Sequence, residues 1–305
     1  MDDVTVPSKK IILILKRLIN YVSYILVILS AVFLIYKFYS LQGLINLKGF
    51  ITDHSIIFTL ACLVYAINNY LLAAGWRSIL KGLDELVSIK MATTIFGVSQ
   101  IAKYIPGNIF QFAGKQVLAV RYDLNSAVVA KSQFFEVIVL LLSALPFSIY
   151  VGVYHFSGLS FLLSVLSFVL IFFIISLILH HFGFCFLISF LNYSLFMFIS
   201  GVLFLLLMSS SVTINNNIST YLFVISSFVA AWLAGFVMPG SPAGLGVRES
   251  ILILLLFPLF RDQSIVFNVA ILIRLVTVIG DLIFFLFSFS IQRLIDGERK
   301  SKKIQ

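Results

Sequence analysis

The sequence predicts an all-α polytopic membrane protein with about six full spans, two re-entrant helical hairpins and an inverted-topology repeat. Its 305 residues are 61% hydrophobic and only 11% charged, whereas a soluble domain carries roughly 25% charged residues. Apolar runs recur along the chain at the length of about 20 residues that a helix needs to cross a bilayer. Two stretches rich in Pro and Gly, residues 103–108 and 238–249, interrupt this pattern. We therefore expect one transmembrane domain over residues 1–305.

The positions of the apolar runs give the spans, each long enough for a membrane-crossing helix of roughly 17 to 25 residues. Full spans are expected at residues 18–38, 55–75, 132–153, 159–179, 184–208 and 264–290. Residues 209–220 form a polar loop. The charged segment 77–90 carries Ile and Leu at helical spacing, which fits a short amphipathic surface helix and equally an ordinary charged loop.

The first break, at Pro106-Gly107, predicts a hairpin with arms at residues 91–104 and 109–121. Pro removes a backbone donor and Gly favours non-helical backbone, so no helix is expected to run through the pair. A helix of about 14 residues is about 21 Å long, against a hydrocarbon core of about 30 Å. These arms are therefore too short to span twice, and we interpret them as a re-entrant pair.

The second break, at residues 238–249, holds two prolines and three glycines between arms at 220–237 and 247–260. Broken backbone at membrane depth is tolerated only where protein or a water-filled cavity covers it. The arm 220–237 is long enough to span by itself, so a tilted span fits this segment as well as a re-entrant arm. At both breaks, a simple kink held by neighbouring helices is the alternative interpretation.

The basic residues predict the orientation of the protein in the membrane. With both termini cytoplasmic, fifteen of the 21 Lys and Arg residues lie inside, three (Lys37, Lys48 and Arg261) lie outside and the other three fall in apolar segments. This asymmetry is the positive-inside pattern of a membrane protein. The net charge of +9 therefore reflects orientation, and we expect no nucleic-acid partner. We expect the protein in the inner membrane of a bacterial cell. Its short basic tails, residues 1–17 and 291–305, are expected in the cytoplasm.

The order of spans and breaks suggests two halves, residues 10–155 and 156–295, that repeat with inverted topology. Many transporters are built from such repeats. Each half has an acidic residue in the span after its break, Glu136 and Asp281, and Arg274 lies seven residues before the second. Ionisable residues in a membrane are functional candidates. An ion pair with a hairpin and a proton or substrate relay both remain open for these acids.

The breaks also place candidate ligand-binding residues. Asn108 is a suitable N-cap for the arm that follows it, and Gln111 and Lys115 share one face of that arm because they are four residues apart. Arg248 begins the second arm of the other hairpin, where Glu249 could orient it. Helix N-termini attract phosphate and carboxylate. Facing helix starts would form a basic cavity that suits an anionic lipid headgroup.

Simpler structural roles fit the same residues. Lys103, the third cation of the expected cavity, and Lys115 are both near enough to the cytoplasmic side to snorkel. Arg248 and Glu249 could pair only with each other. The four His and two Cys residues show no metal-binding spacing, so no metal and no cofactor are expected.

At its two breaks the chain resembles the lysylphosphatidylglycerol synthase transmembrane-region family. The resembling segments are Gln100–Asn108 and Ser241–Glu249, and the similarity extends over roughly residues 10–295. Ala243 stands where the family usually has Gly, and Lys115 stands near a position that is often Arg. The resemblance assigns functional roles to Pro106, Gly107, Gly244, Gly246, Arg248 and Glu249.

The resemblance implies a stand-alone, flippase-like integral membrane module that moves anionic or modified lipids between leaflets. The family's full synthases add a soluble aminoacyltransferase domain. We expect no aminoacyl transfer by this chain itself and no enzymatic activity. The expected ligand is a phospholipid or a polyprenyl-phosphate-linked sugar, with a separate lipid-modifying or glycosyltransferase enzyme, or a second copy of the chain, as partner. A membrane glycosyltransferase or other lipid-modifying enzyme, and an ion-coupled transporter of small solutes, are the alternatives.

Overall fold

The computed structural model describes residue 49 and residues 53–104, 110–156, 161–214, 217–238, 244, 246–260 and 262–304, and every regular element in them is helical. The expected span 18–38 and the residues Pro106, Gly107, Asn108 and Ala243 lie outside these ranges. The helices, in chain order, are α3 Ser55–Gly82, α4 Ile89–Gln100, the 3₁₀ helix η1 Ile101–Tyr104, α5 Phe110–Arg121, α6 Ser126–Phe156, α7 Phe161–Phe182, α8 Phe184–Ser211, α9 Ile218–Val237, α10 Val247–Leu256 and α11 Gln263–Ile304.

Six of the described helices are long and apolar enough to cross a membrane: α3, α6, α7, α8, α9 and α11. Five of them coincide with expected spans. The sixth, α9, was expected as an arm of the second hairpin, and its 20 residues meet the length requirement for a span. The chain is thus an all-α, multi-pass membrane protein.

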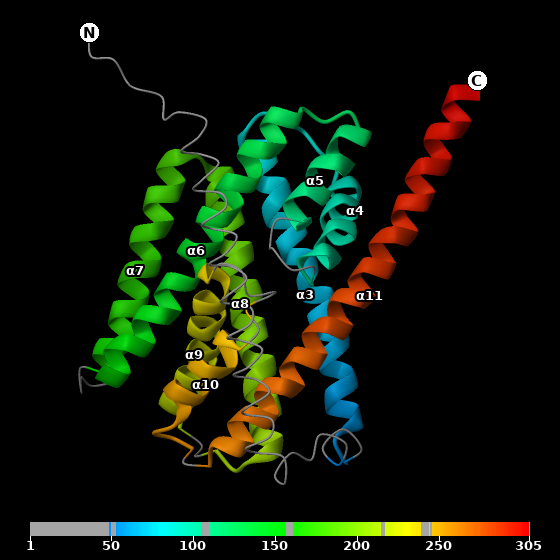
Figure 1. The fold of residues 1–305 in the computed structure, drawn as a ribbon. Helices are drawn as coiled ribbons and strands as arrows, with labels where there is room; N and C mark the ends of the chain where they lie inside the picture. Colours follow the sequence, from blue (N-terminus) through cyan, green and yellow to red (C-terminus); the bar gives the residue numbers. More distant parts are fainter. Residues whose placement is uncertain are drawn as a thin grey trace, which may run out of the picture.

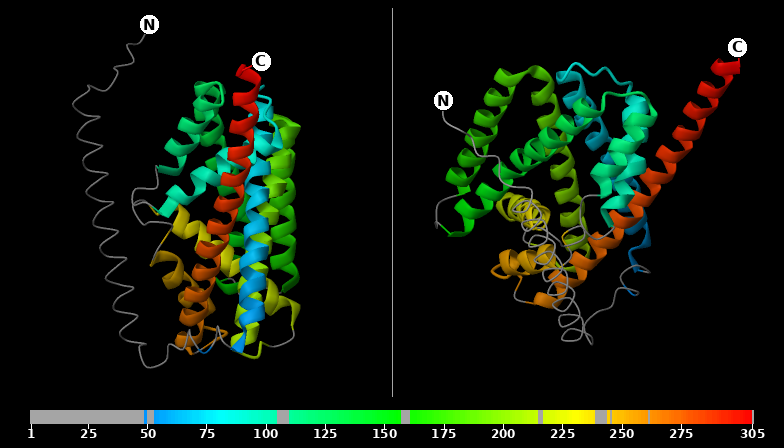
Figure 2. Two further views of the ribbon diagram at one scale, coloured as in Figure 1. Left: turned by 90° about the vertical axis from the view of Figure 1, so that its right-hand side faces the viewer. Right: turned by 45° about the horizontal axis from the view of Figure 1, so that its top comes forward.

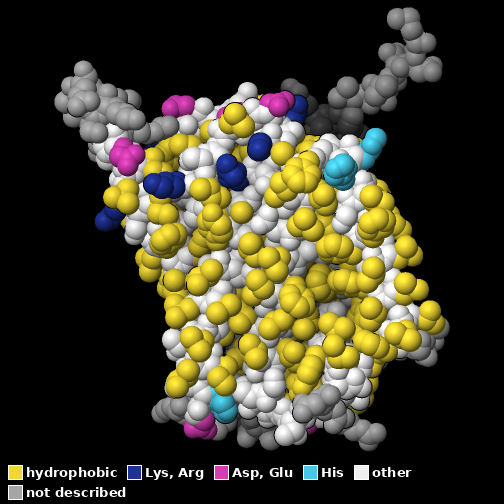
Figure 3. Space-filling view, turned by 180° about the vertical axis from the view of Figure 1, so that it is seen from behind, with side chains coloured by type: hydrophobic (Ala, Val, Ile, Leu, Met, Phe, Trp, Pro, Cys, Tyr) yellow, Lys and Arg dark blue, Asp and Glu magenta, His cyan; other side chains and the backbone are white. Residues whose placement is uncertain are grey.

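The helices run alternately up and down through the bundle (Figure 1). The α3–α4 and α5–α6 connections, the α7–α8 turn and the C-terminal end of α11 lie at one end. The α8–α9 and α10–α11 connections lie at the other. A wide apolar surface covers the middle of the face seen in Figure 3, and Lys and Arg side chains gather near the first end on that face. Apolar helix faces without a protein partner, as on the peripheral α7, suit contact with lipid.

Two pairs of helices flank the breaks. Helices α4 and α5 contact each other, and so do α9 and α10. The first pair lies in the upper half of the molecule and the second in the lower half (Figure 1). The side view in Figure 2 places the broken ends of both pairs near mid-height. The described helix ends beside both breaks thus approach the middle of the bundle.

Of the two interpretations of residues 77–90, a separate amphipathic surface helix does not form. Helix α3 continues to Gly82, and its end is followed by Asp84 in a left-handed backbone conformation with φ of 62°. Helix α4 then begins anew, with the hydroxyl of Ser88 accepting a hydrogen bond from the backbone N–H of Met91 at 3.3 Å. The first part of this segment forms the end of transmembrane helix α3, whose intrahelical hydrogen bonds extend past the apolar run.

Helix α3 is central to the packing and contacts α4, α6, α8 and α11. Its fully buried Trp76 donates from the indole Nε1 to the hydroxyl of Ser132 on α6 at 3.0 Å. Asn68 donates to the carbonyl oxygen of Phe196 on α8 at 2.9 Å and to the hydroxyl of Ser200 at 3.1 Å. Polar links of this kind join helices in a bilayer, where apolar side chains gain little by leaving lipid.

Candidate functional site

A cavity of about 290 Å³ lies where the two broken helix pairs meet. Its wall is formed by side chains of α3, α4, η1, α5, α6, α8, α9, α10 and α11. Four charged residues line it: Lys103, Glu136, Arg248 and Arg274. Small-molecule sites usually measure roughly 300–1,000 Å³, so the volume is near the lower end of that range. Residues that are distant in sequence, from both breaks, therefore share one site.

The end of η1, next to the first break, is held by Asp281 of α11. The ammonium of Lys103 lies 2.7 Å from the Oδ2 of Asp281, and the hydroxyl of Tyr104 donates to the same oxygen at 2.5 Å. Asn69 of α3 donates to Oδ1 at 3.0 Å. The Asp281 carboxylate is fully buried, so these three donors compensate its desolvation.

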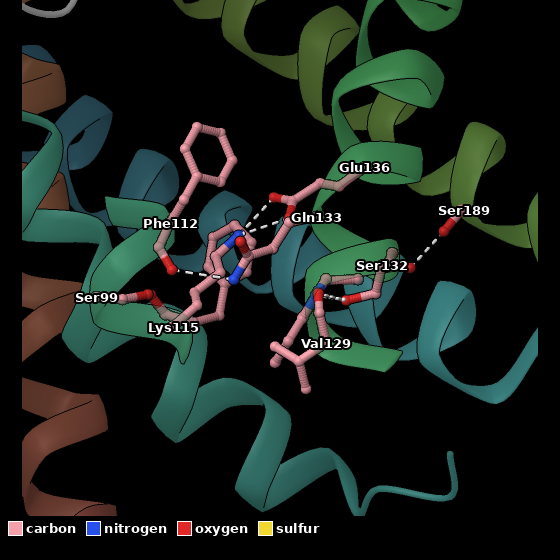
Figure 4. A network of polar contacts seen from close by, with 11 residues as sticks. Ser99, Phe112, Lys115, Val129, Ser132, Gln133, Glu136 and Ser189 are labelled. Carbon is pink, nitrogen blue, oxygen red and sulfur yellow. Dashed lines mark hydrogen bonds and ion pairs between the residues drawn. The ribbon is translucent and has the colours of Figure 1, made fainter. Parts of the chain in front are cut away.

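Helix α5 is held to α6 by a second buried ion pair (Figure 4). The Lys115 ammonium lies 2.6 and 2.7 Å from the two carboxylate oxygens of Glu136. It also lies 4.0 Å from the ring centroid of Phe96, a cation–π distance. Gln133 adds a hydrogen bond to the carbonyl oxygen of Phe112 at 3.0 Å. Lys115 is only 2% exposed, so it does not snorkel to the surface.

The start of α10 is tied to α11 by Glu249. One carboxylate oxygen accepts the backbone N–H of Gly246 at 2.7 Å, and the other accepts the Nε–H of Arg274 at 2.6 Å. Gly246 has φ of 83°, a conformation that glycine adopts without steric cost. In both halves of the chain, the helix after the break is thus joined to the next long helix by an ion pair.

Arg248 points along a narrow space between two glycines. A Cβ added to Gly235 of α9 would lie 2.5 Å from the Cγ of Arg248, and one added to Gly244 would lie 2.8 Å from its Nε. The guanidinium carbon lies 5.5 Å from the ring centroid of Trp232. Its buried Nε has no hydrogen-bond partner. Within the described part of the chain, Arg248 forms no ion pair.

The structure decides between pairings that the sequence left open. Arg248 and Glu249 do not pair with each other, because the Glu249 carboxylate is bonded to Arg274 and Gly246. The acids Glu136 and Asp281 pair with residues of the first hairpin, Lys115 and Lys103. The ion-pair interpretation of these acids is therefore the one that the geometry matches.

The expected site residues divide into three groups. Lys103, Gln111, Glu136, Gly244, Arg248 and Arg274 line the cavity. Lys115, Gly246, Glu249 and Asp281 lie behind its wall and position the lining residues. Pro106, Gly107 and Asn108 lie outside the described residues.

Sequence reasoning missed several residues of the site. Tyr65, Trp232 and Gly235 line the cavity, and Asn69 holds Asp281. Two consecutive Asn residues inside the apolar run of α3 were a usable signal, since polar side chains at membrane depth need partners. Tyr65 and Trp232 could not be singled out from the sequence, because aromatic residues are common in this chain, with 32 Phe and 12 Tyr.

No group of three or more His, Cys, Asp or Glu residues that could hold a metal ion occurs within the described ranges. No protein-family model, no curated protein and no solved structure matches the chain. The resemblance at the two breaks therefore stays a prediction.

Proposed function

We propose that this protein is a lipid flippase or lipid-transport protein of a bacterial inner membrane. It binds the phosphate-bearing headgroup of an anionic lipid in the cavity between the two broken helix pairs. The observation that carries this proposal is Arg248, a cation on the cavity wall whose charge no described carboxylate neutralises. The other cations on the wall, Lys103 and Arg274, each have an acidic partner.

An uncompensated charge within a membrane-spanning bundle is costly. Desolvating a charged side chain costs several kcal/mol unless an opposite charge or hydrogen bonds replace the lost water. Trp232 and the two glycines hold Arg248 in place without neutralising it. A guanidinium binds phosphate through parallel hydrogen bonds. A phosphate in the cavity would therefore supply the missing partner.

The surroundings of Arg248 also favour an anion. Arg248 lies in the first turn of α10, and a helix N-terminus carries a partial positive charge of about half an elementary charge. Gln100, Gln111 and Thr277 lie on the same cavity wall and add hydrogen-bonding groups. Aromatic side chains, among them Tyr65 and Phe112, complete a wall that also suits the apolar part of a lipid.

The placement of the two broken pairs supports exposure of the cavity to alternate sides. The α4–α5 pair lies toward one end of the bundle and the α9–α10 pair toward the other (Figures 1 and 2). An inverted repeat of residues 10–155 and 156–295, with re-entrant hairpins in each half, would place the site at their junction, as in many transporters. Both termini are cytoplasmic in this proposal, because the basic end of the bundle would face inward.

Replacing Arg248 by Ala is expected to slow lipid translocation by at least about tenfold, because the charge-assisted contact to the headgroup is lost. The measurement is the flipping of fluorescent phosphatidylglycerol in proteoliposomes, followed by quenching from the outside. Arg293→Ala is the matched control, since Arg293 also lies over an aromatic ring, at 4.8 Å from the centroid of Phe289, but is exposed. Equal rates for the wild type and Arg248→Ala would refute the site.

A soluble competitor distinguishes lipid transport from solute transport. Glycerophosphoglycerol carries the same headgroup without acyl chains. We expect it to compete weakly with phosphatidylglycerol, because most of the binding energy of a lipid in a membrane comes with its membrane-embedded part. If glycerophosphoglycerol competes as strongly as the lipid and a pH gradient drives its uptake, the protein is instead a small-solute transporter with Glu136 at its cavity.

Gly235→Ala is expected to weaken phosphatidylglycerol binding by about tenfold although Arg248 is retained, because overpacking a close contact costs about 1–3 kcal/mol. The added methyl group would overlap the aliphatic part of the Arg248 side chain. Binding to purified protein in nanodiscs measures the effect. Gly152→Ala on α6, with no atom within 4 Å of the added Cβ, is the control. Unchanged binding in Gly235→Ala would show that the position of Arg248 does not matter.

A further inference from the structure

The charge balance of the cavity identifies the class of headgroup, if the proposed lipid-binding function holds. We infer that the site is selective for a lipid with a single negative charge, a phosphodiester, over a lipid diphosphate. The sequence left a phospholipid and a polyprenyl-phosphate-linked sugar open and did not specify the charge of the phosphate group. The distinction follows from which charges around the cavity are already compensated.

Three cations at or behind the cavity wall are matched one to one with acids. Their closest N–O distances are 2.7 Å for Lys103 and Asp281, 2.6 Å for Lys115 and Glu136, and 2.6 Å for Arg274 and Glu249. The acidic side chains of these pairs are almost completely buried. Each pair is therefore neutral as a unit and has little net attraction for a further anion.

Arg248 remains as the single uncompensated charge among the described residues of the wall. The sequence of the break segments adds no charged side chain to this count. Residues 105–109, 239–243 and 245 contain no Asp, Glu, Lys or Arg. The described residues around the cavity thus have a net formal charge of +1.

A headgroup with one negative charge makes such a site neutral, whereas a diphosphate leaves at least one negative charge without a partner. Two unit charges about 4 Å apart interact by about 4 kcal/mol at an effective dielectric constant of about 20. A surplus charge in the cavity also loses hydration that nothing replaces. Opening an existing pair to neutralise it would leave the acid of that pair buried and alone. The second charge of a diphosphate is therefore a penalty in this site.

The test compares two lipids with the same dioleoylglycerol body, phosphatidylglycerol and diacylglycerol pyrophosphate, in competition for the purified full-length protein in nanodiscs. The wild type is expected to bind phosphatidylglycerol at least about tenfold more tightly. Asp281→Asn should reverse or abolish this preference, because it leaves Lys103 on the cavity wall as a second uncompensated cation. The amide that replaces the carboxylate can still accept the hydrogen bond from Asn69.

Two further variants separate charge from general damage. The double variant Lys103→Met with Asp281→Asn removes both charges and is expected to restore the preference for phosphatidylglycerol. Asp296→Asn breaks the exposed pair with Arg121, whose N–O distance is 2.7 Å, and should leave the preference unchanged. The wild-type comparison stands even if Asp281→Asn does not fold.

The outcomes distinguish this inference from the proposed function. Tighter wild-type binding of the pyrophosphate lipid, or an unchanged preference in folded Asp281→Asn, overturns the single-charge selectivity and leaves lipid binding intact. Loss of both lipids' binding in Arg248→Ala supports the site. Full binding of both lipids by Arg248→Ala overturns the proposed site and the selectivity together. Inorganic phosphate, used as a third competitor, should not displace either lipid at equal concentration, and equal displacement would refute a lipid ligand.

Discussion

Lys115→Met is expected to destabilise the protein by about 3–5 kcal/mol, because it leaves the buried Glu136 carboxylate without its cation. The pair is almost inaccessible, with 2% of the Lys115 side chain and 5% of the Glu136 side chain exposed. Lys115 also contributes cation–π contacts, the closest with Phe96. Loss of these contacts adds to the cost. Unfolding of the purified protein in mixed detergent micelles measures the change in free energy.

Two controls make the Lys115 result interpretable. Lys131→Met removes a cation that is five residues from Glu136 in sequence but exposed on α6, and it should change the unfolding free energy little. The double variant Lys115→Met with Glu136→Gln should recover part of the lost stability, since no buried charge then lacks a partner. A stronger effect from Lys131→Met than from Lys115→Met would contradict the pairing.

Gly75→Ala is expected to destabilise the protein by about 1–3 kcal/mol, because Gly75 of α3 packs directly against Tyr193 of α8. An added Cβ would overlap the Cε1 of Tyr193 and lie 2.8 Å from its Cδ1 and Cζ. Tyr193 is completely buried, so its ring has little room to move. The hydroxyl of Ser189, also on α8, donates to the Gly75 carbonyl oxygen. Displacement of α8 would therefore weaken this hydrogen bond as well.

Thermal denaturation in detergent, followed by the loss of monodisperse protein, provides the measurement for Gly75. Gly152→Ala is the matched control on α6, because nothing lies within 4 Å of its added Cβ. Ala is a better helix former than Gly by up to about 1 kcal/mol, so this control should have an unchanged or slightly raised melting temperature. If both variants have the same melting temperature as the wild type, the close α3–α8 contact at Gly75 is wrong.

The sequence by itself determined the class of protein and most of its transmembrane helices. Hydropathy is informative because a bilayer requires long apolar helices that satisfy their own backbone hydrogen bonds. The expected spans 55–75, 132–153, 184–208 and 264–290 lie within α3, α6, α8 and α11. The breaks were visible for the same reason, since Pro and Gly are the residues that interrupt such helices.

Only the tertiary structure decided which charges are paired. In the sequence, Lys131 lies five residues before Glu136, but side chains on one helix face each other at a spacing of three or four residues. The observed partner, Lys115, comes from another helix, and so do the partners of Asp281 and Glu249. Such pairs depend on how helices pack, which hydropathy does not specify.

The role of Arg248 depends on both the sequence and the tertiary structure. The sequence singled it out as a cation beside a break. The structure assigned Glu249 to Arg274 and placed Arg248 between Gly235 and Gly244 on the cavity wall. Its uncompensated charge, on which the proposed function depends, became apparent only once the described acids Glu136, Glu249 and Asp281 had been matched with other cations. Charge compensation is a property of three-dimensional neighbours, and neighbours in the chain do not determine it.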